Sequence, residues 1–310
     1  MQFKPVVYNV DMKNTDNWKE LAYGLPDDVL QYIPNANLDE IHLMEGAGKV
    51  GNIYNPKKAG YDVYFMHKEH GGIARVTNEK DKDGKFVGLF PESDLGWHNN
   101  GNFRHWRHVV ESAIAFYCVK PGIDVVTSFC NSKQAYEDLP HDLKIVAENF
   151  EYWAEFDKDN AIYEFDDKAL NSGLHEMLAM FDGKLKPTGR KNNNVNNPQR
   201  GSWKPLIVEH PRRTVPSWFK DRGKAIYTGH FGLMRKCRSK ENGQEFTMEE
   251  MQPLIKILHD HLFQEKYIYN HHWKKGDLIL NDQFFSYHKR NAVKGDRLLY
   301  RTAFNYKNLE

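Results

Sequence analysis

A histidine and an asparagine, His98 and Asn100, lie two residues apart in the segment GWHNNG, residues 96–101. Residues i and i+2 of a β-strand project to the same face, so both side chains can point into the interior of a β-barrel. An imidazole nitrogen and an amide oxygen are both able to bind a metal ion. Alone the pair carries little weight, because a chain with 15 histidines contains such combinations by chance.

The C-terminal segment LILNDQFFSYHKRNAVKGDRLLYRTAF carries another histidine, His288, and two arginines four residues apart, Arg297 and Arg301. In a strand the two arginines share one face with Leu299 and Ala303. If this face is internal, two guanidinium groups enter the core, where charges are seldom found without partners of opposite sign. A dicarboxylate ligand would supply one partner, and a buried acidic residue is the alternative partner for Arg301.

Other motifs fit their chemistry poorly. Residues 46–51, GAGKVG, match the pattern G-x-G-x-x-G, but Pro56 and Gly60 interrupt the helix that a dinucleotide-binding site requires, so we interpret them as a glycine-rich turn. Three histidine pairs are explained by chance: His67/His70, His259/His261 and His271/His272. In a helix, His259 and His261 lie about 200° apart and cannot bind one ion together.

The composition excludes several classes of protein. The 43 Lys and Arg residues nearly balance 42 Asp and Glu residues, so no overall charge attracts nucleic acid or an acidic membrane. The three cysteines, Cys118, Cys130 and Cys237, are too few and too scattered for a disulfide framework or a zinc ribbon. The N-terminal segment lacks the apolar core of a signal peptide, and no apolar run approaches the roughly 20 residues of a membrane span. We therefore expect a cytoplasmic globular protein.

Many short strands and a few helices favour a β-barrel or sandwich with helical buttresses. The expected strands cover residues 41–45, 61–67, 71–78, 86–90, 112–119, 124–130, 205–211, 224–231, 267–273, 277–282 and 297–306. The expected helices cover residues 14–25, 26–33, 134–150 with a break at Pro140, and 247–264 with a capping box from Thr247 to Glu250. We find no internal repeat and no linker, so we predict one domain, residues 1–310. The polar stretch of about residues 186–202, with five Asn in 192–197, should form a mobile loop that closes over substrate.

Taken in order, these motifs resemble the TauD/TfdA-like family, the taurine dioxygenase-type enzymes that depend on 2-oxoglutarate and Fe(II). Residues 86–101 look like the segment that leads to the first metal ligand of the family. GIDVVTSFCNSKQAYEDLP is similar to the family's G-G-D-T…A-Y-E-x-L-P run, PLIVEHP to its His-Pro segment, and WKKGDLILNDQFFSYH to its W-x-x-G-D…D-N…H signature. The resemblance covers about residues 75–306 and implies a double-stranded β-helix core of the jelly-roll, cupin-like type.

The resemblance also implies roles for single residues. His98, His288 and the position of Asn100 would bind Fe(II), Thr127 and Arg297 would bind 2-oxoglutarate, and Arg301 would lie near the substrate. Such an enzyme converts 2-oxoglutarate and O2 to succinate and carbon dioxide while it oxidises a second molecule. For this chain the resemblance implies hydroxylation of a small anionic or amino-acid-like substrate. It does not decide whether the protein is a monomer or a homo-oligomer.

Asn100 departs from the family, whose second ligand is normally Asp or Glu. The neutral amide removes one negative charge and should hold Fe(II) less tightly. Four interpretations remain: a weak ligand, a position left to water or another carboxylate with Asp94 the nearest in sequence, a site that binds without catalysis, and a halide site as in halogenases, which have Gly or Ala there. Asn100-Gly101 is also a pair prone to deamidation, which would create a carboxylate after synthesis.

Two alternatives to a hydroxylase follow from this departure and from local charge. One is a catalytically inactive barrel that binds 2-oxoglutarate or a similar dicarboxylate. The other is a halogenase-type or nucleic-acid-modifying oxygenase of the same fold; the neutral overall charge disfavours the latter, although a local basic stretch supports it: Arg190, Lys191, Arg200 and Lys204.

Overall fold

The computed structural model describes most of the chain: residues 2–55, 58, 61–62, 65–88, 94–100, 111–154, 186–187, 202–210, 222–228 and 234–309. The predicted loop at about 186–202 lies outside these residues except for its ends. Across the described part, no helix is both long and apolar enough to span a membrane. The fold is mainly β, with few helices, as the sequence predicted.

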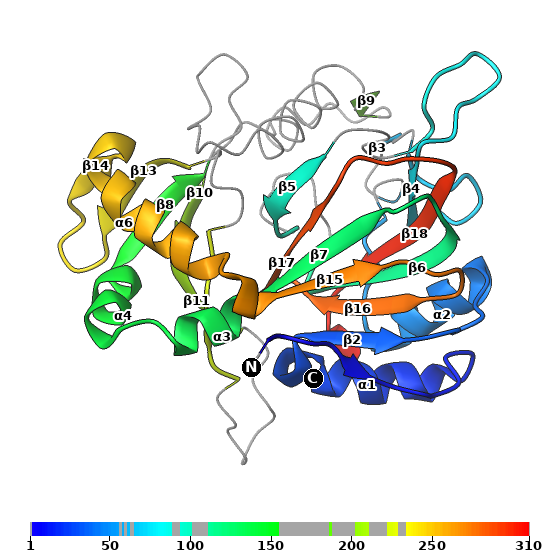
Figure 1. Ribbon diagram of the computed structural model, residues 1–310, viewed down its shortest axis with the longest axis horizontal. Helices are drawn as coiled ribbons and strands as arrows, with labels where there is room; N and C mark the ends of the chain where they lie inside the picture. Colours follow the sequence, from blue (N-terminus) through cyan, green and yellow to red (C-terminus); the bar gives the residue numbers. More distant parts are fainter. Residues whose placement is uncertain are drawn as a thin grey trace.

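Two β-sheets pack face to face and carry most of the predicted site (Figure 1). The larger has the order β1-β2-β16-β6-β18-β4, formed by Val6–Val7, Leu30–Ile33, Leu278–Asp282, Ala113–Pro121, Arg297–Phe304 and Ile73–Thr77. The smaller has the order β15-β7-β17-β5, formed by Ile268–His272, Val126–Asn131, Ser286–Arg290 and Leu95–His98. The rings of Phe116 in the larger sheet and Phe129 in the smaller are 6.4 Å apart at their centroids, so the inner faces meet.

Strand β18 shows how the alternation of side chains positions the site. Leu299 and Ala303 belong to the apolar cluster that fills the space between the two sheets. Leu298, Tyr300 and Phe304 belong to a second cluster on the opposite face, against the N-terminal helices. The prediction that Arg297 and Arg301 share a face with Leu299 and Ala303 is therefore confirmed, and the structure shows that this face is internal.

Two N-terminal helices, α1 (Thr15–Asp28) and α2 (Glu40–Val50), cover the outer face of the larger sheet. They lie beside its strands in Figure 1. The predicted strand at residues 41–45 was wrong, because this segment forms the start of α2. The glycine-rich turn at 46–51 was also wrong: Gly46 lies in α2, where a Cβ atom would come within 2.1 Å of the Trp18 ring of α1. The absent side chain is what allows the two helices to pack closely.

The predicted helix at residues 26–33 was wrong in its second half. Helix α1 runs through Pro26 to Asp28, and β2 (Leu30–Ile33) then pairs antiparallel with β16. This apolar segment satisfies its backbone through a partner almost 250 residues away in sequence, which local periodicity does not reveal. The helical segment at 134–150 does break at Pro140, into α3 (Ser132–Glu137) and α4 (His141–Glu148).

A second group of elements flanks the smaller sheet (Figure 1). It contains a sheet of order β10-β8-β13-β14, formed by Ser202–Pro205, Phe150–Ala154, Met234–Ser239 and Glu245–Thr247, and the predicted pair β11 (Ile207–Glu209) and β12 (Lys224–Ile226). Helix α6 (Met248–Leu262) starts with the predicted capping box. Phe263 follows this helix and stacks on Trp97 of β5 at 4.7 Å between centroids, which supports the outer face of the smaller sheet. Short elements complete the chain: β3 (Tyr61–Asp62) paired with β9 (Lys186–Pro187), η3 (Glu265–Tyr267) and η4 (Lys307–Leu309).

Candidate active site

The two predicted histidine ligands meet on the inner face of the smaller sheet. His98 of β5 and His288 of β17 are directly opposite each other in the antiparallel ladder. Their ring centroids are 4.1 Å apart, and both side chains are buried. The His288 ring also contacts Phe116 across the space between the sheets, at 5.5 Å between centroids. Two buried imidazoles so close together can bind one metal ion.

His98 is held in the tautomer that a metal ligand needs. Its Nδ1 atom lies 2.8 Å from the carbonyl oxygen of Gly96. A carbonyl oxygen only accepts hydrogen bonds, so Nδ1 carries the proton and Nε2 keeps its lone pair. Burial lowers the pKa of His98 to about 4, the nearby charges of Arg301 and Arg290 lower it too, and the bond to Gly96 opposes them. The ring is therefore neutral near pH 7.

Asn100 lies beside the two histidines. Its side-chain Nδ2 atom is 3.5 Å from Nε2 of His288, and a 180° rotation of the amide would bring Oδ1 to that place. Two atoms bound at right angles to one ion at about 2.1 Å would lie about 3.0 Å apart, so the amide is within reach of a shared ion. The backbone N–H of Asn100 donates to Oε1 of Gln283 at 2.8 Å, which holds the chain in position just after β5.

No acidic side chain takes the place of Asn100 within the described residues. In this part of the chain no three His, Cys, Asp or Glu side chains come together as a metal site. Asp94 is among the residues described, so it does not join His98 and His288. The described donor set is therefore two imidazoles and an amide, with one negative charge fewer than a site with an Asp or Glu ligand.

A buried arginine lies at the start of β18. Arg297 is only 2% exposed, and its Nε and Nη1 atoms have no hydrogen-bond partner among the residues that the structure describes. Its backbone is held by Thr77, whose hydroxyl donates to the Arg297 carbonyl oxygen at 2.6 Å, and by Asn78, which accepts from its N–H. Burial lowers the pKa of Arg297, and the charge of Arg290 lowers it further. A buried guanidinium with donors unused suits an anionic ligand.

Thr127 of β7 has a hydroxyl proton that is ready to be donated. The indole Nε1 of Trp273 donates to Oγ1 of Thr127 at 2.8 Å, so the threonine oxygen already acts as an acceptor. Its own proton is then available to a ligand. Thr127 is 4% exposed, and Arg297 and Thr127 both fit the predicted contacts to a carboxylate.

Arg301 has an acidic partner. Its Nη2 atom lies 2.8 Å from Oε2 of Glu111, with side chains 10% and 2% exposed. Of the two interpretations of Arg301, the geometry matches the ion pair with a buried acid. The predicted contact to substrate stays a prediction.

Sequence reasoning missed two buried polar residues close to the candidate ligands, Arg290 and Gln283. Arg290 is buried and stands two residues after His288 in β17, a spacing that places both on the same face. This spacing was the available signal. Gln283 contacts Asn100 across 183 positions of sequence, for which no local pattern gives a signal.

A buried network holds the turn that leads into β17. Asp282 accepts hydrogen bonds from the backbone N–H groups of Phe284 and Phe285, both at 2.9 Å. Its other oxygen contacts His210 at 2.9 Å and Tyr306 at 2.7 Å. Burial would raise the pKa of Asp282, but these charged and hydrogen-bonding partners outweigh it and lower the pKa. The network thus positions the strand that carries His288.

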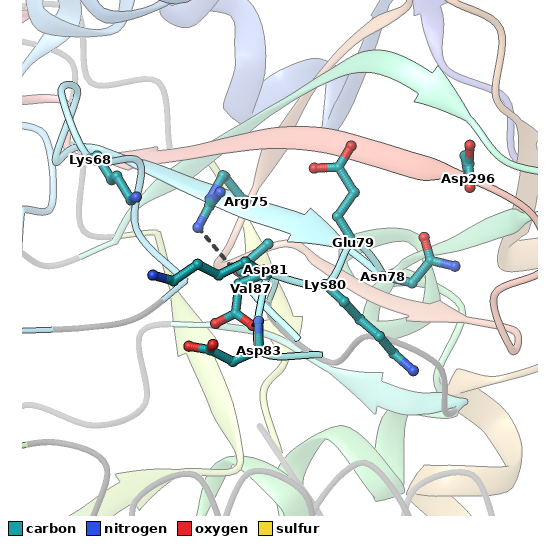
Figure 2. A pocket seen from close by; sticks show the side chains of 10 residues that line it. Lys68, Arg75, Asn78, Glu79, Lys80, Asp81, Asp83, Val87 and Asp296 are labelled. Carbon is teal, nitrogen blue, oxygen red and sulfur yellow. Dashed lines mark hydrogen bonds between the residues drawn. The ribbon is translucent and has the colours of Figure 1, made fainter. Parts of the chain in front are cut away.

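A surface cavity of about 830 Å³ lies elsewhere, beside the hairpin that follows β4. Figure 2 shows Lys68, Arg75, Glu79 and Asp81 around it, with Arg75 donating to the carbonyl oxygen of Val87 at 3.2 Å. None of the predicted site residues lines this cavity. The three histidine pairs of the sequence belong to no group of three or more His, Cys, Asp or Glu side chains within the described residues.

The structure thus brings His98, His288 and Asn100 together, and it places the buried Arg297 on the inward face of β18. Among solved structures, a candidate alpha-ketoglutarate-dependent taurine dioxygenase from Burkholderia xenovorans matches with a TM-score of 0.65 and 14% identity, over 98% of this chain and 87% of the other. AAD-2 in complex with Mn(II) and N-oxalylglycine matches with a TM-score of 0.62 and 15% identity, over 98% and 94%. At such identities these similarities establish the fold. Comparison with curated protein sequences gave no significant match.

The family described as "Taurine catabolism dioxygenase TauD, TfdA family" matches residues 37–303, so the chain belongs to this family. Enzymes of the family use Fe(II), 2-oxoglutarate and O2. The protein is thus an oxidoreductase of the 2-oxoglutarate-dependent dioxygenase type, as the order of its motifs predicted.

Proposed function

We propose that the protein is a hydroxylase for a small anionic or amino-acid-like substrate. His98, His288 and Asn100 bind Fe(II) in this proposal, and Arg297 and Thr127 bind the far carboxylate of 2-oxoglutarate. The observation that carries it is Arg297, a buried cation whose Nε and Nη1 atoms lack partners within the described residues. A buried donor without a partner lowers the stability of the fold by about 1–3 kcal/mol, and by more for a charged group. A bound anionic co-substrate that accepts from these donors explains why such an arginine is present.

The chain's own residues orient the reactants and exclude water. Bound Fe(II) would supply the activation of oxygen and the oxidative decarboxylation of 2-oxoglutarate. His98 offers the lone pair of Nε2 because its Nδ1 proton is held by Gly96. Phe116 and Phe129 pack on His288 and shield the centre from bulk water. Arg297 and Thr127 fix the co-substrate, and fixed orientation contributes a large share of catalysis.

Asn100 acts in this proposal as a neutral ligand through its amide oxygen. Its amide lies within reach of an ion held by His288, and no carboxylate of the described residues competes for the position. The same neutrality favours a second candidate function, a barrel that binds 2-oxoglutarate without oxidising a substrate. Formation of succinate distinguishes the two.

Other features of the structure support what we propose for the type of core, the number of domains and the cellular location. The two packed sheets support a double-stranded β-helix core. Contacts of α1, α2 and β18 across the length of the chain support one domain. The three cysteines are buried and free of disulfides, which supports a cytoplasmic location.

The test is metal-dependent binding followed by turnover. The protein is titrated with 2-oxoglutarate under anaerobic conditions with Mn(II), and aerobic succinate formation is then measured with Fe(II) against a panel of anionic candidates. His98→Ala and His288→Ala should abolish metal-dependent binding while the fold remains. His272→Ala, an exposed histidine of β15, is the matched control and should bind like the wild type. Retained binding in both ligand variants would refute the metal site. Binding without succinate under any condition would leave the inactive barrel.

A further inference from the structure

Arg290 has a place inside the barrel that the proposed function does not use. It stands in β17 two residues after His288, and residues so spaced project to one face of a strand. Its partner in the antiparallel ladder is Thr127, and the partner of His288 is Phe129. Directly opposed residues of an antiparallel pair project to the same side of the sheet. Arg290, Thr127 and His288 therefore all face the space between the sheets.

The neighbouring residue on β17 confirms this orientation. Lys289 projects to the opposite face, where its Nζ atom lies 4.8 Å from the centroid of the Trp97 ring. Arg290 itself is 5% exposed. Two cations of adjacent residues thus have different surroundings, one against the outer apolar layer and one within the barrel.

Arg290 also lies near the other groups of the site. Its charge contributes to the lowered pKa of Arg297 and to that of His98. Two guanidiniums inside one barrel repel each other, and burial makes this repulsion more costly than in water. Arg301 has Glu111 as its counter-ion, but no salt bridge to Arg297 occurs among the described residues. A carboxylate bound between Arg290 and Arg297 would be attracted by both guanidiniums.

We propose that Arg290 binds the far carboxylate of 2-oxoglutarate together with Arg297 and Thr127. The inference rests on the proposed function and adds a second cation to its co-substrate site. A carboxylate offers about four lone-pair positions, enough for two guanidiniums and a hydroxyl. Thr127 stands opposite Arg290 in the ladder and is the predicted contact of this carboxylate, so a carboxylate that Thr127 binds lies on the side of the sheet to which Arg290 projects.

The arrangement has a measurable consequence for ligand choice. Arg290 adds a second guanidinium to the end of the pocket where Arg297 lies. A second guanidinium at this end favours a dianionic 2-oxo acid over a monoanionic one, because only the former carries a second carboxylate to the two arginines. Discrimination between these two acids is therefore the measurable property of Arg290.

The experiment compares two 2-oxo acids that differ in the far carboxylate. Full-length protein loaded with Mn(II) is titrated anaerobically by calorimetry with 2-oxoglutarate and with 2-oxobutanoate, which lacks that group. Arg290→Gln should weaken 2-oxoglutarate binding at least tenfold and change 2-oxobutanoate binding less than threefold. Lys289→Gln, which removes the adjacent cation on the other face, is the matched control and should leave both affinities near those of the wild type.

The outcomes separate this inference from the function on which it rests. A wild-type protein that binds no 2-oxoglutarate would overturn the proposed function. A wild type that binds, with Arg290→Gln equally tight for 2-oxoglutarate, would overturn only the role of Arg290, and so would an equal loss for both acids. If Arg290→Gln does not fold, Arg290→Lys replaces it. The lysine lacks the planar fork, so the preference for 2-oxoglutarate over 2-oxobutanoate should fall at least threefold, and an unchanged preference would overturn the inference.

Discussion

The ion pair between Arg301 and Glu111 predicts a large loss of stability when its negative partner is removed. Nη2 of Arg301 lies 2.8 Å from Oε2 of Glu111, and the two side chains are 10% and 2% exposed. Glu111→Gln keeps the shape of the side chain but leaves the guanidinium buried without its counter-charge. Breaking a buried pair in this way costs about 3–5 kcal/mol.

The expected loss in free energy of unfolding corresponds to a fall in the melting temperature (Tm). With an unfolding entropy of about 2.1 cal/mol/K per residue, a chain of 310 residues has about 0.65 kcal/mol/K, so Tm should fall by about 5–8 °C. Scanning calorimetry measures this shift. The double variant Glu111→Leu/Arg301→Met removes both charges and should return to within a few degrees of the wild type, because well-packed apolar residues often replace a buried pair without loss.

A small effect would refute the reasoning. If Glu111→Gln melts within about 2 °C of the wild type, the pair contributes little to folding. Arg301 would then be available for the role that the resemblance implies, contact with an anionic substrate. The corresponding kinetic signature is a raised KM for substrate in Arg301→Met.

Three further changes test the metal and co-substrate sites. Arg297→Lys keeps the charge but loses the bidentate fork, so 2-oxoglutarate affinity measured by calorimetry should fall about tenfold or more, for about 1.5–3 kcal/mol; an unchanged affinity would assign the carboxylate to another group. If the amide binds iron, anaerobic Fe(II) affinity should be highest in Asn100→Asp, lower in the wild type and lowest in Asn100→Gly. Mass spectrometry must first exclude deamidation of the wild type. Equal affinities of the wild type and Asn100→Gly would show that Asn100 does not bind the metal. Gln283→Leu deletes the acceptor for the Asn100 N–H and should weaken Mn(II) binding by about tenfold, for about 1.4 kcal/mol, without changing the affinity order of the Asn100 variants; Mn(II) affinity equal to that of the wild type would contradict a positioning role.

The amino-acid sequence by itself determined the local elements and the order of the motifs. Thr247 and Glu250 form the predicted capping box, because this structure needs only residues three positions apart. The alternation in residues 297–304 showed which side chains of β18 share a face, because the period of a strand is two residues, and the structure shows which face is internal. The resemblance of two motifs to the family pointed to His98 and His288, and the structure shows that they meet on adjacent strands.

Local patterns failed at residues 41–45 and 26–33. A short apolar run fits either a helix or a strand, and its partner decides which forms. In α2 the deciding contact is the close approach of Gly46 to Trp18, and for β2 it is the ladder with β16. Both contacts depend on the packing of distant segments.

Only the tertiary structure decided how the charges of the site are arranged. Glu111 meets Arg301 across 190 positions and Gln283 meets Asn100 across 183, separations over which no sequence period carries information. The register between β17 and β7 places Arg290 opposite Thr127, and a shift by one residue would turn Arg290 outward. Residue types thus specified which groups are available for metal and anion chemistry, while strand register determined which of them share the interior, because buried charges are positioned by long-range pairing.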